Sequence, residues 1–96
     1  MTSEREIEKY LVREVERIHG LALKWLSPGW SGAPDRIVLL PGGRIFFVEL
    51  KAPKKVPRKL QIFRIGHLRA LGFTVAVIDS KISVDEFVLW CKEVRD

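Results

Sequence analysis

Two carboxylates and one ammonium are spaced so that they could act together on a phosphate. Asp35 follows a Gly-Ala-Pro turn, and Glu49 and Lys51 end an apolar run further along the chain. Magnesium takes one or two protein carboxylates and keeps several waters. A neighbouring ammonium favours the extra negative charge of the transition state when a phosphodiester is attacked. Metal-assisted phosphodiester chemistry therefore depends on whether the fold brings these three side chains together.

The segment that carries these residues is predicted to be a β-hairpin. Apolar strands at residues 35–40 and 44–51 are joined by Pro41-Gly42-Gly43, and such a turn is typical of hairpins. With a three-residue loop, Asp35 lies directly opposite Glu49, with Cβ atoms about 4.5–5.5 Å apart. Two like charges at that distance repel each other, and burial raises the cost. A bound divalent cation would remove this penalty, whereas a two-residue loop would shift the pairing and break the site.

Lys51 strengthens the interpretation of these residues as a metal-dependent site, although each residue taken singly has a simpler explanation. Lys51 lies two positions after Glu49 and therefore projects from the same face of the sheet. Asp35 alone could cap a turn, and Glu49 and Lys51 could form a solvated strand end. Their combination at one end of the sheet favours a site.

The rest of the chain supplies elements that could position this hairpin. Serine followed three residues later by glutamate is a capping-box pattern, and apolar residues at helical spacing follow it. A strand, a helix and a strand in succession favour a parallel crossover. We predict an α/β fold of order αβββαβα, with a mixed sheet flanked by helices. Its elements are a helix from Ser3 to Gly20, strands at 21–26, 35–40 and 44–51, a helix at 58–71, a buried strand at 73–79 and a last helix opening at Ser83.

Length and composition set further bounds. The chain has 96 residues, 47% of them hydrophobic, which predicts one domain spanning 1–96 with a modest core that a second copy would help to stabilise. The net charge of +5 favours a polyanionic partner. The single cysteine, Cys91, excludes an intrachain disulfide and is expected to be a small buried residue. No signal peptide or membrane-length apolar run is visible, which favours an intracellular setting.

A family resemblance rests on the same residues. Gly32-Ala-Pro-Asp35, then Glu49-Leu-Lys51 and Gln61, resembles the PD-(D/E)XK nuclease superfamily. More narrowly, it is similar to the small stand-alone VRR-NUC domains known from phages and bacteria, over nearly the whole chain. The resemblance implies a restriction-endonuclease-like fold and a cytoplasmic protein of a bacterial cell or its phage.

The resemblance also implies residue roles. Asp35 and Glu49 would bind Mg²⁺ or Mn²⁺, with the backbone carbonyl of Leu50 as a further ligand. Such a metal polarises phosphoryl oxygens and lowers the pKa of water. Lys51 would position or activate the attacking water, and Gln61 would orient water or phosphate.

The family further places a glutamate of the first helix near the metal. Glu4 lies one turn before Ile7 and two turns before Leu11, so it can share their inward face. Glu8 is a rival at similar spacing. We choose Glu4 as the expected residue.

Basic and aromatic residues surround the proposed site. A basic cluster beside a metal site could hold phosphates without reading bases, although charge runs are often only solubilising. Trp30, between glycine and serine, could stack on a base or pack in the core or a dimer. The expected nucleic-acid contacts are Lys24, Lys54, Lys55, Arg58, Lys59 and Arg64; Arg36 and Arg69 are further candidates, and Arg36 should point to the opposite sheet face from Asp35.

The sequence thus predicts a metal-dependent DNA endonuclease. Small stand-alone relatives resemble Holliday-junction resolvases, so the resemblance implies a homodimer that cuts branched DNA. The alternatives are a non-catalytic nucleic-acid-binding module and a nuclease that acts on nicked or linear duplexes, or on RNA.

Overall fold

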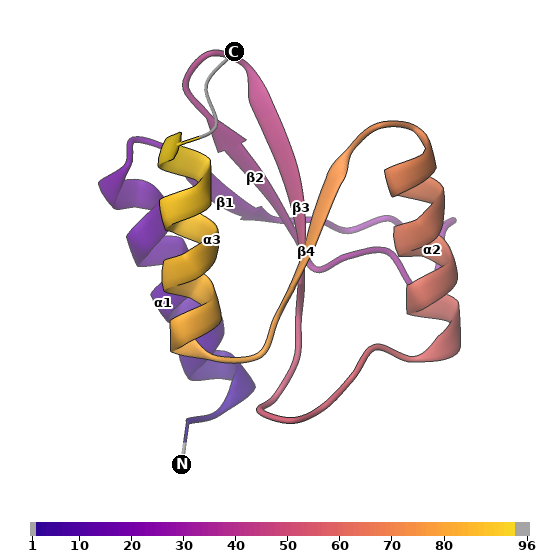
Figure 1. The fold of residues 1–96 in the computed structure, drawn as a ribbon. Helices are drawn as coiled ribbons and strands as arrows, with labels where there is room; N and C mark the ends of the chain where they lie inside the picture. The colour runs from indigo at the N-terminus through magenta and orange to yellow at the C-terminus, as the bar shows by residue number, and fades with distance from the viewer. Residues whose placement is uncertain (1, 94–96) are drawn as a thin grey trace.

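A four-stranded sheet forms the centre of the protein (Figure 1). The computed structural model describes residues 2–93. The strands are β1 (Leu21–Lys24), β2 (Arg36–Leu40), β3 (Arg44–Leu50) and β4 (Thr74–Ile78), and they lie in this order across the sheet. The first three strands are antiparallel, and β4 runs parallel to β3. The mixed sheet and the parallel crossover are therefore as predicted.

The β2–β3 hairpin has the register that the three-residue loop predicted. Leu40 pairs with Arg44, and the ladder continues to Arg36 opposite Val48. Gly42 and Gly43 adopt φ angles of 86° and 74°, in the left-handed region that glycine enters without a steric penalty. The turn residues therefore fix which side chains of the two strands face each other.

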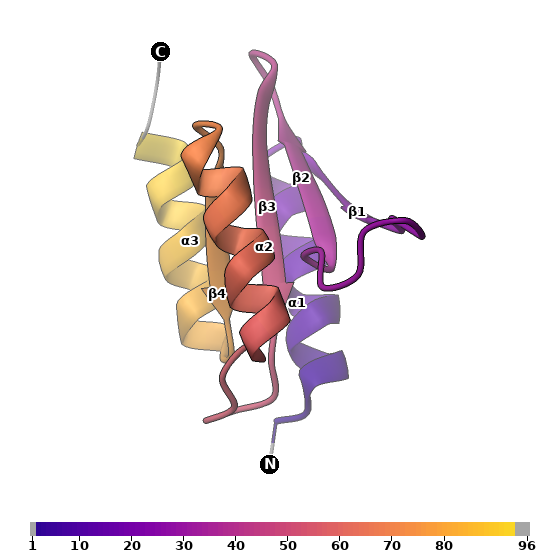
Figure 2. The same cartoon turned by 90° about the vertical axis from the view of Figure 1, so that its right-hand side faces the viewer.

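In the described part of the chain, three helices cover the two faces of the sheet. They are α1 (Glu4–Arg17), α2 (Lys59–Ala70) and α3 (Lys81–Glu93). Helices α1 and α3 lie side by side on one face, and α2 lies alone on the other face (Figures 1 and 2). The Tyr10 hydroxyl donates a hydrogen bond to Asp85 at 2.6 Å and ties α1 to α3.

The core is divided unequally between the two faces. Under α2, only Phe47, Ile65, Leu68 and Val75 form a buried apolar cluster. The other face carries a much larger cluster, because α1 presents a continuous apolar stripe and α3 packs beside it on the same face. Its buried members are Ile7, Leu11, Val15, Ala22, Val38, Leu40, Phe46, Val48, Leu50, Ile78, Val84, Phe87 and Cys91. The expected burial of Cys91 is confirmed.

Two local predictions were wrong. The last helix begins at Lys81 rather than at Ser83, and the Ser80 hydroxyl accepts the hydrogen bond of the Ser83 amide at 3.0 Å. The Ser80 hydroxyl therefore caps the helix three residues earlier than the Ser83–Glu86 pattern indicated. The strand β4 is an edge strand, so Val77 is 39% exposed instead of buried.

Candidate active site at the end of the β2–β3 hairpin

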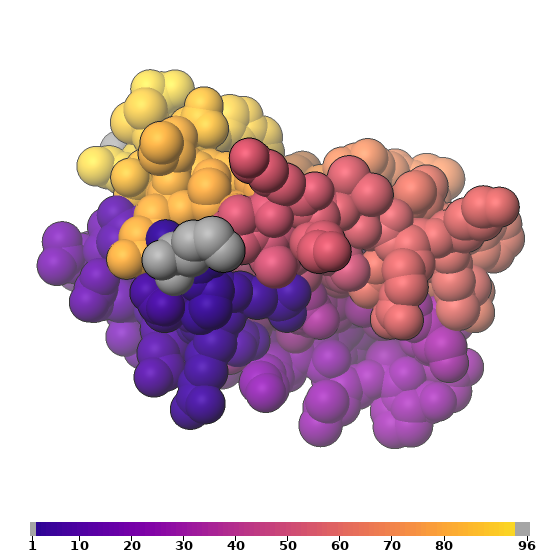
Figure 3. All heavy atoms as spheres, turned by 90° about the horizontal axis from the view of Figure 1, so that it is seen from below, coloured from indigo at the N-terminus to yellow at the C-terminus, as the bar shows by residue number. Residues whose placement is uncertain are grey.

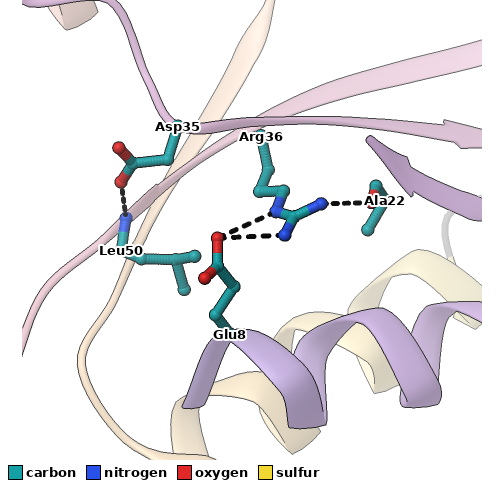
Figure 4. A network of polar contacts seen from close by, with 5 residues as sticks. All are labelled: Glu8, Ala22, Asp35, Arg36 and Leu50. Carbon is teal, nitrogen blue, oxygen red and sulfur yellow. Dashed lines mark hydrogen bonds and ion pairs between the residues drawn. The ribbon is translucent and has the colours of Figure 1, made fainter. Parts of the chain in front are cut away.

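Asp35 and Glu49 are brought together by the register of the hairpin. Arg36, the first residue of β2, pairs with Val48. Asp35 comes one residue before it and therefore lies opposite Glu49. One carboxylate oxygen of Asp35, Oδ2, accepts a hydrogen bond from the Leu50 amide at 2.8 Å (Figure 4). This bond holds the carboxylate of Asp35 against the end of β3.

Glu49 is the most unusual residue of the site because its carboxylate is buried. The residue is only 1% exposed. Its Oε2 accepts a hydrogen bond from Gln61 Nε2 at 2.6 Å and lies 3.4 Å from Lys51 Nζ. Its Oε1 is buried without a hydrogen-bond partner among residues 2–93. A buried charged oxygen without a partner is strongly unfavourable, so Oε1 is suited to act as a ligand of a metal cation.

The pKa of Glu49 reflects this environment. Burial, followed by the negative charge of Asp35, raises the pKa of Glu49 from 4.5 to about 7, and the ammonium of Lys51 only partly opposes the shift. The protein therefore holds two carboxylates in a place where their charges are not fully balanced by Lys51. A divalent cation between them would supply the missing charge and favour the ionised form of Glu49.

Gln61 links α2 to the site in a fixed orientation. It is the third residue of α2 and is buried. Its Oε1 accepts a hydrogen bond from the Arg58 amide at 2.8 Å, so its Nε2 is directed to Glu49. The structure thus places Gln61 at the site, as expected, and does not leave it as an exposed helix residue.

The two first-helix glutamates both reach the site from α1. Glu4 and Glu8 line a cavity of about 280 Å³ together with Asp35 and Leu50. Glu8 Oε2 accepts hydrogen bonds from Arg36 Nε at 3.1 Å and Nη2 at 3.0 Å. Glu4 is exposed at the start of α1. The structure therefore places both candidates at this cavity and joins one of them to an arginine.

Arg36 has a structural role that the sequence did not reveal. Its guanidinium also donates to the Ala22 carbonyl at 2.9 Å, so it joins α1, β1 and β2 (Figure 4). Arg36 faces α1, whereas Glu49 faces α2. The alternation of side chains along β2 predicted that Arg36 would point away from the face of Asp35. No local pattern marks the pair, because Glu8 and Arg36 belong to different elements.

The predicted phosphate-binding cations lie around the same end of the sheet. Lys24 lines the cavity beside Asp35. The segment that follows β3 is exposed between α1 and α2 when the molecule is viewed from this end (Figure 3). Four of the predicted cations lie on this segment or at the start of α2, and all are exposed: Lys54, Lys55, Arg58 and Lys59.

Arg64 and Arg69 make contacts within the protein. Arg64 Nε donates to the Ser31 carbonyl at 2.9 Å, and its guanidinium lies 4.8 Å from the centre of the Trp30 ring. Arg69 Nη2 donates to the Val75 carbonyl at 2.7 Å. Arg69 therefore anchors α2 to β4, and Arg64 anchors the loop before Asp35.

The donor set fits a magnesium-type ion. Within residues 2–93, no three histidine, cysteine, aspartate or glutamate side chains form a ready metal cage. Magnesium does not need one, because it typically uses one or two carboxylates and retains waters. Asp35, the partnerless oxygen of Glu49 and a backbone carbonyl match that requirement.

Comparisons with known proteins identify the class of domain to which the chain belongs. A solved structure described as a VRR_NUC domain superposes with a TM-score of 0.85 and 36% sequence identity, covering 92% of this chain and 96% of that chain. "Putative nuclease p44" of Acyrthosiphon pisum secondary endosymbiont phage 1 is 51% identical over 78 residues, which are 81% of this chain and 84% of the phage protein. No family model matches the chain.

The chain belongs to the VRR_NUC family of nuclease domains. The resemblance predicted from the Asp35, Glu49 and Lys51 motif is therefore confirmed, as is the fold class. Among the described helices, none is long and apolar enough to cross a membrane.

Proposed function

We propose that the protein is a metal-dependent endonuclease that hydrolyses DNA phosphodiesters. The observation that carries this proposal is the buried Oε1 of Glu49, which lacks a partner among the described residues and lies on a carboxylate next to Asp35. A protein that only bound nucleic acid would gain nothing from two adjacent carboxylates, because they repel phosphate.

The residues that would hold Mg²⁺ or Mn²⁺ are Asp35, Glu49 and the backbone carbonyl of Leu50. When bound, such an ion supplies Lewis acidity toward the phosphodiester and its nucleophile. The hydrogen bond from the Leu50 amide fixes Asp35, and the hydrogen bond from Gln61 fixes Glu49. Two ligands are thus oriented before any ion arrives, which reduces the reorganisation that binding requires.

Lys51 would stabilise the negative charge that develops on the phosphate. Its side chain is only 14% exposed and its Nζ lies 3.4 Å from Glu49 Oε2. A cation held in a largely dry site acts more strongly than one in water. Gln61 would orient Glu49 and, through it, the phosphate and the attacking water.

Glu4 is proposed as the additional first-helix carboxylate near the ion. It lines the same cavity as Asp35. The rival Glu8 already has its charge balanced by Arg36. Glu4 is therefore the better placed of the two carboxylates to interact with an incoming cation.

The substrate would be held by its phosphates. Lys24, Lys54, Lys55, Arg58 and Lys59 surround the site on exposed segments, and such cations give affinity without sequence preference. Arg64 is a further proposed contact. We propose a branched substrate such as a four-way DNA junction, cut by a homodimer whose two-fold symmetry presents one active site to each of two opposed strands.

The test is cleavage of a labelled four-way junction beside a linear duplex of the same sequence, with Mg²⁺, with Mn²⁺ and with chelator. Wild type, Glu49→Gln and the matched exposed control Glu16→Gln are compared. Metal-dependent, symmetric junction cutting that Glu49→Gln abolishes and Glu16→Gln retains is the expected result. Equal cutting of both substrates would remove the junction preference. Binding without cleavage under either metal would leave a non-catalytic nucleic-acid-binding module.

A further inference from the structure

Helix α2 exposes an apolar side that the core does not explain. Its inner side carries the buried residues Ile65 and Leu68. Away from the sheet, Leu60 is 45% and Phe63 59% exposed, and their spacing of three residues makes them neighbours on the helix surface. Ile62, which is 57% exposed, lies on the opposite flank of the helix. A helix on a sheet normally has one apolar and one polar side. The exposed neighbours Leu60 and Phe63 therefore indicate a surface that binds a partner molecule.

Rings and cations are interleaved on this side of α2. The His67 ring centre lies 4.8 Å from that of Phe63 and 6.3 Å from that of Trp30. The Arg64 guanidinium lies 4.8 Å from the Trp30 ring centre and 5.8 Å from that of Phe63. We call these four residues, Trp30, Phe63, Arg64 and His67, the α2 aromatic surface.

The α2 aromatic surface is assembled from two segments that are locked together. The loop between β1 and β2 runs across to α2 (Figure 1), where Arg64 binds the Ser31 carbonyl at 2.9 Å. At Gly32, a Cβ atom would lie 2.8 Å from Leu60 Cγ, and the φ angle is 85°. The close approach therefore requires glycine, and it fixes Trp30 against the helix.

The same helix contacts the catalytic centre. Gln61 donates to Glu49 from the inner side of α2, and Phe63 follows two residues later on the outer side. The helix rises about 9 Å from Gln61 to His67. That length corresponds to roughly two to three nucleotide steps of about 3.4 Å along a strand. A strand whose phosphate lies at Asp35 and Glu49 would therefore pass the α2 aromatic surface within a few nucleotides.

The charge around α2 indicates which kind of molecule binds the α2 aromatic surface. No Asp or Glu occurs between Glu49 and Asp79, so the whole of α2 and its flanking segments are basic or neutral. Another exposed apolar area, the groove of about 390 Å³ between β4 and α3, includes Glu86 and Trp90. Within residues 2–93, none of the rings that line this groove has a cation over it, and Glu86 borders the groove, which suits a protein partner rather than nucleic acid. Aromatic rings beside cations are the usual platform for unpaired bases.

We propose that the α2 aromatic surface is a subsite for unpaired nucleobases next to the scissile phosphate. Bases released from the helical stack would lie on Phe63 and His67, with Arg64 held over the neighbouring ring of Trp30. The subsite would make the enzyme prefer DNA with unstacked or single-stranded nucleotides beside the cut, as found at a branch point. This inference rests on the proposed nuclease function.

The first test measures binding by fluorescence anisotropy in chelator, so that no cleavage occurs. The probes are a fluorescein-labelled duplex with a short unpaired thymidine tail, the same DNA with abasic sites in the tail, and the fully paired duplex. The expected result is that wild type binds the tailed probe about 5- to 100-fold more tightly than the abasic one. Equal binding to both probes overturns the subsite without the use of any variant.

The second test combines Phe63→Ala with the abasic probe. Phe63→Ala should bind the normal tail more weakly than wild type by the same factor. It should bind the abasic tail as tightly as wild type does, because the variant and the abasic sites remove the same stacking interaction. Phe63→Trp should restore binding, and Ile82→Ala, an exposed apolar truncation on α3, should leave it unchanged. Losses that add for the two changes would overturn the proposal.

A third measurement addresses the competing occupant, a second copy of this chain. Sedimentation of wild type and Phe63→Ala should give the same oligomeric state. A variant that dissociates while its binding per subunit is unchanged would make the α2 aromatic surface an interface between copies. If wild type cuts no DNA with either metal, the proposed function fails while the binding test still stands. If it cuts but does not discriminate abasic tails, only the subsite fails.

Discussion

The two faces of the sheet are built for different purposes. The face under α1 and α3 is largely apolar, and Ile7, Leu11 and Val15 of α1 are fully buried there. Within residues 2–93, the buried apolar cluster under α2 has four members, and this face also contains the carboxyl of Glu49 and the amide of Gln61. The first face supplies most of the hydrophobic free energy, while the second accepts an unfavourable buried charge. The comparison separates the residues that hold the fold from those that hold the reaction.

The largest effect should come from the carboxylates of the α2 face. Asp35→Asn or Glu49→Gln should lower the cleavage rate by a factor of about 10³ or more, because each would remove a charge that the ion and the phosphate require. The free energy of unfolding in chelator should stay the same or rise, since a buried repulsion is relieved. Single-turnover cleavage and urea unfolding measure the two quantities. Appreciable cleavage by either variant would exclude that residue from the site.

Truncation of the α1 face should give the opposite result. Leu11→Ala should lower the free energy of unfolding by about 2–5 kcal/mol, because Leu11 is fully buried in the larger cluster and its loss leaves a cavity. Cleavage per folded molecule should be unchanged well below the unfolding transition. Urea denaturation followed by circular dichroism measures the loss. A selective loss of cleavage with full stability would mean that the two faces are not independent.

The pH dependence of stability should show the charge buried under α2. Glu49 has a pKa of about 7 in the folded protein and an ordinary value of 4.5. The folded state therefore binds the extra proton between these values, and stability falls as the pH rises through about 7. At about 1.4 kcal/mol per pKa unit, wild type in chelator should lose up to about 3 kcal/mol relative to Glu49→Gln between pH 4.5 and pH 8.

The reference variant cancels the titration of all other groups. Adding Mg²⁺ at pH 8 should restore the lost stability of wild type and leave Glu49→Gln little changed, because a bound ion favours the ionised carboxylate. A flat difference between wild type and variant across this pH range would show that Glu49 is ionised without the ion.

The same contrast explains what the sequence predicted and what it did not. The larger face follows from a clear helical repeat in α1, and the hairpin register follows from the turn Pro41 to Gly43, so both are encoded locally. The smaller face is not encoded locally, because α2 exposes apolar residues such as Leu60 and Phe63 among its charged ones and so has no clear apolar stripe. The pairing of Glu8 with Arg36 and the orientation of Gln61 by the Arg58 amide and Glu49 depend on how separate elements meet.

The errors have the same origin. The apolar run of β4 predicted a buried strand, but whether another strand covers its edge is decided by the whole sheet. Ser83 and Ser80 both offer a capping hydroxyl, and the choice between them depends on where the chain leaves β4. The candidate metal ligands were found because their spacing is set by a single hairpin. The first-helix glutamate remained open because it comes from another layer.

The smallest effects should distinguish Glu4 from Glu8, which approach the site from the stable face. Glu4→Gln should raise the Mg²⁺ concentration for half-maximal cleavage several-fold and leave stability nearly unchanged, because Glu4 is exposed. Glu8→Gln should lower the free energy of unfolding by about 1–2 kcal/mol, because Arg36 would keep a half-buried charge without its carboxylate. Metal titrations of cleavage and urea unfolding of both variants separate the two effects. The reverse pattern would assign the additional metal carboxylate to Glu8, with Arg36 as the residue that positions it.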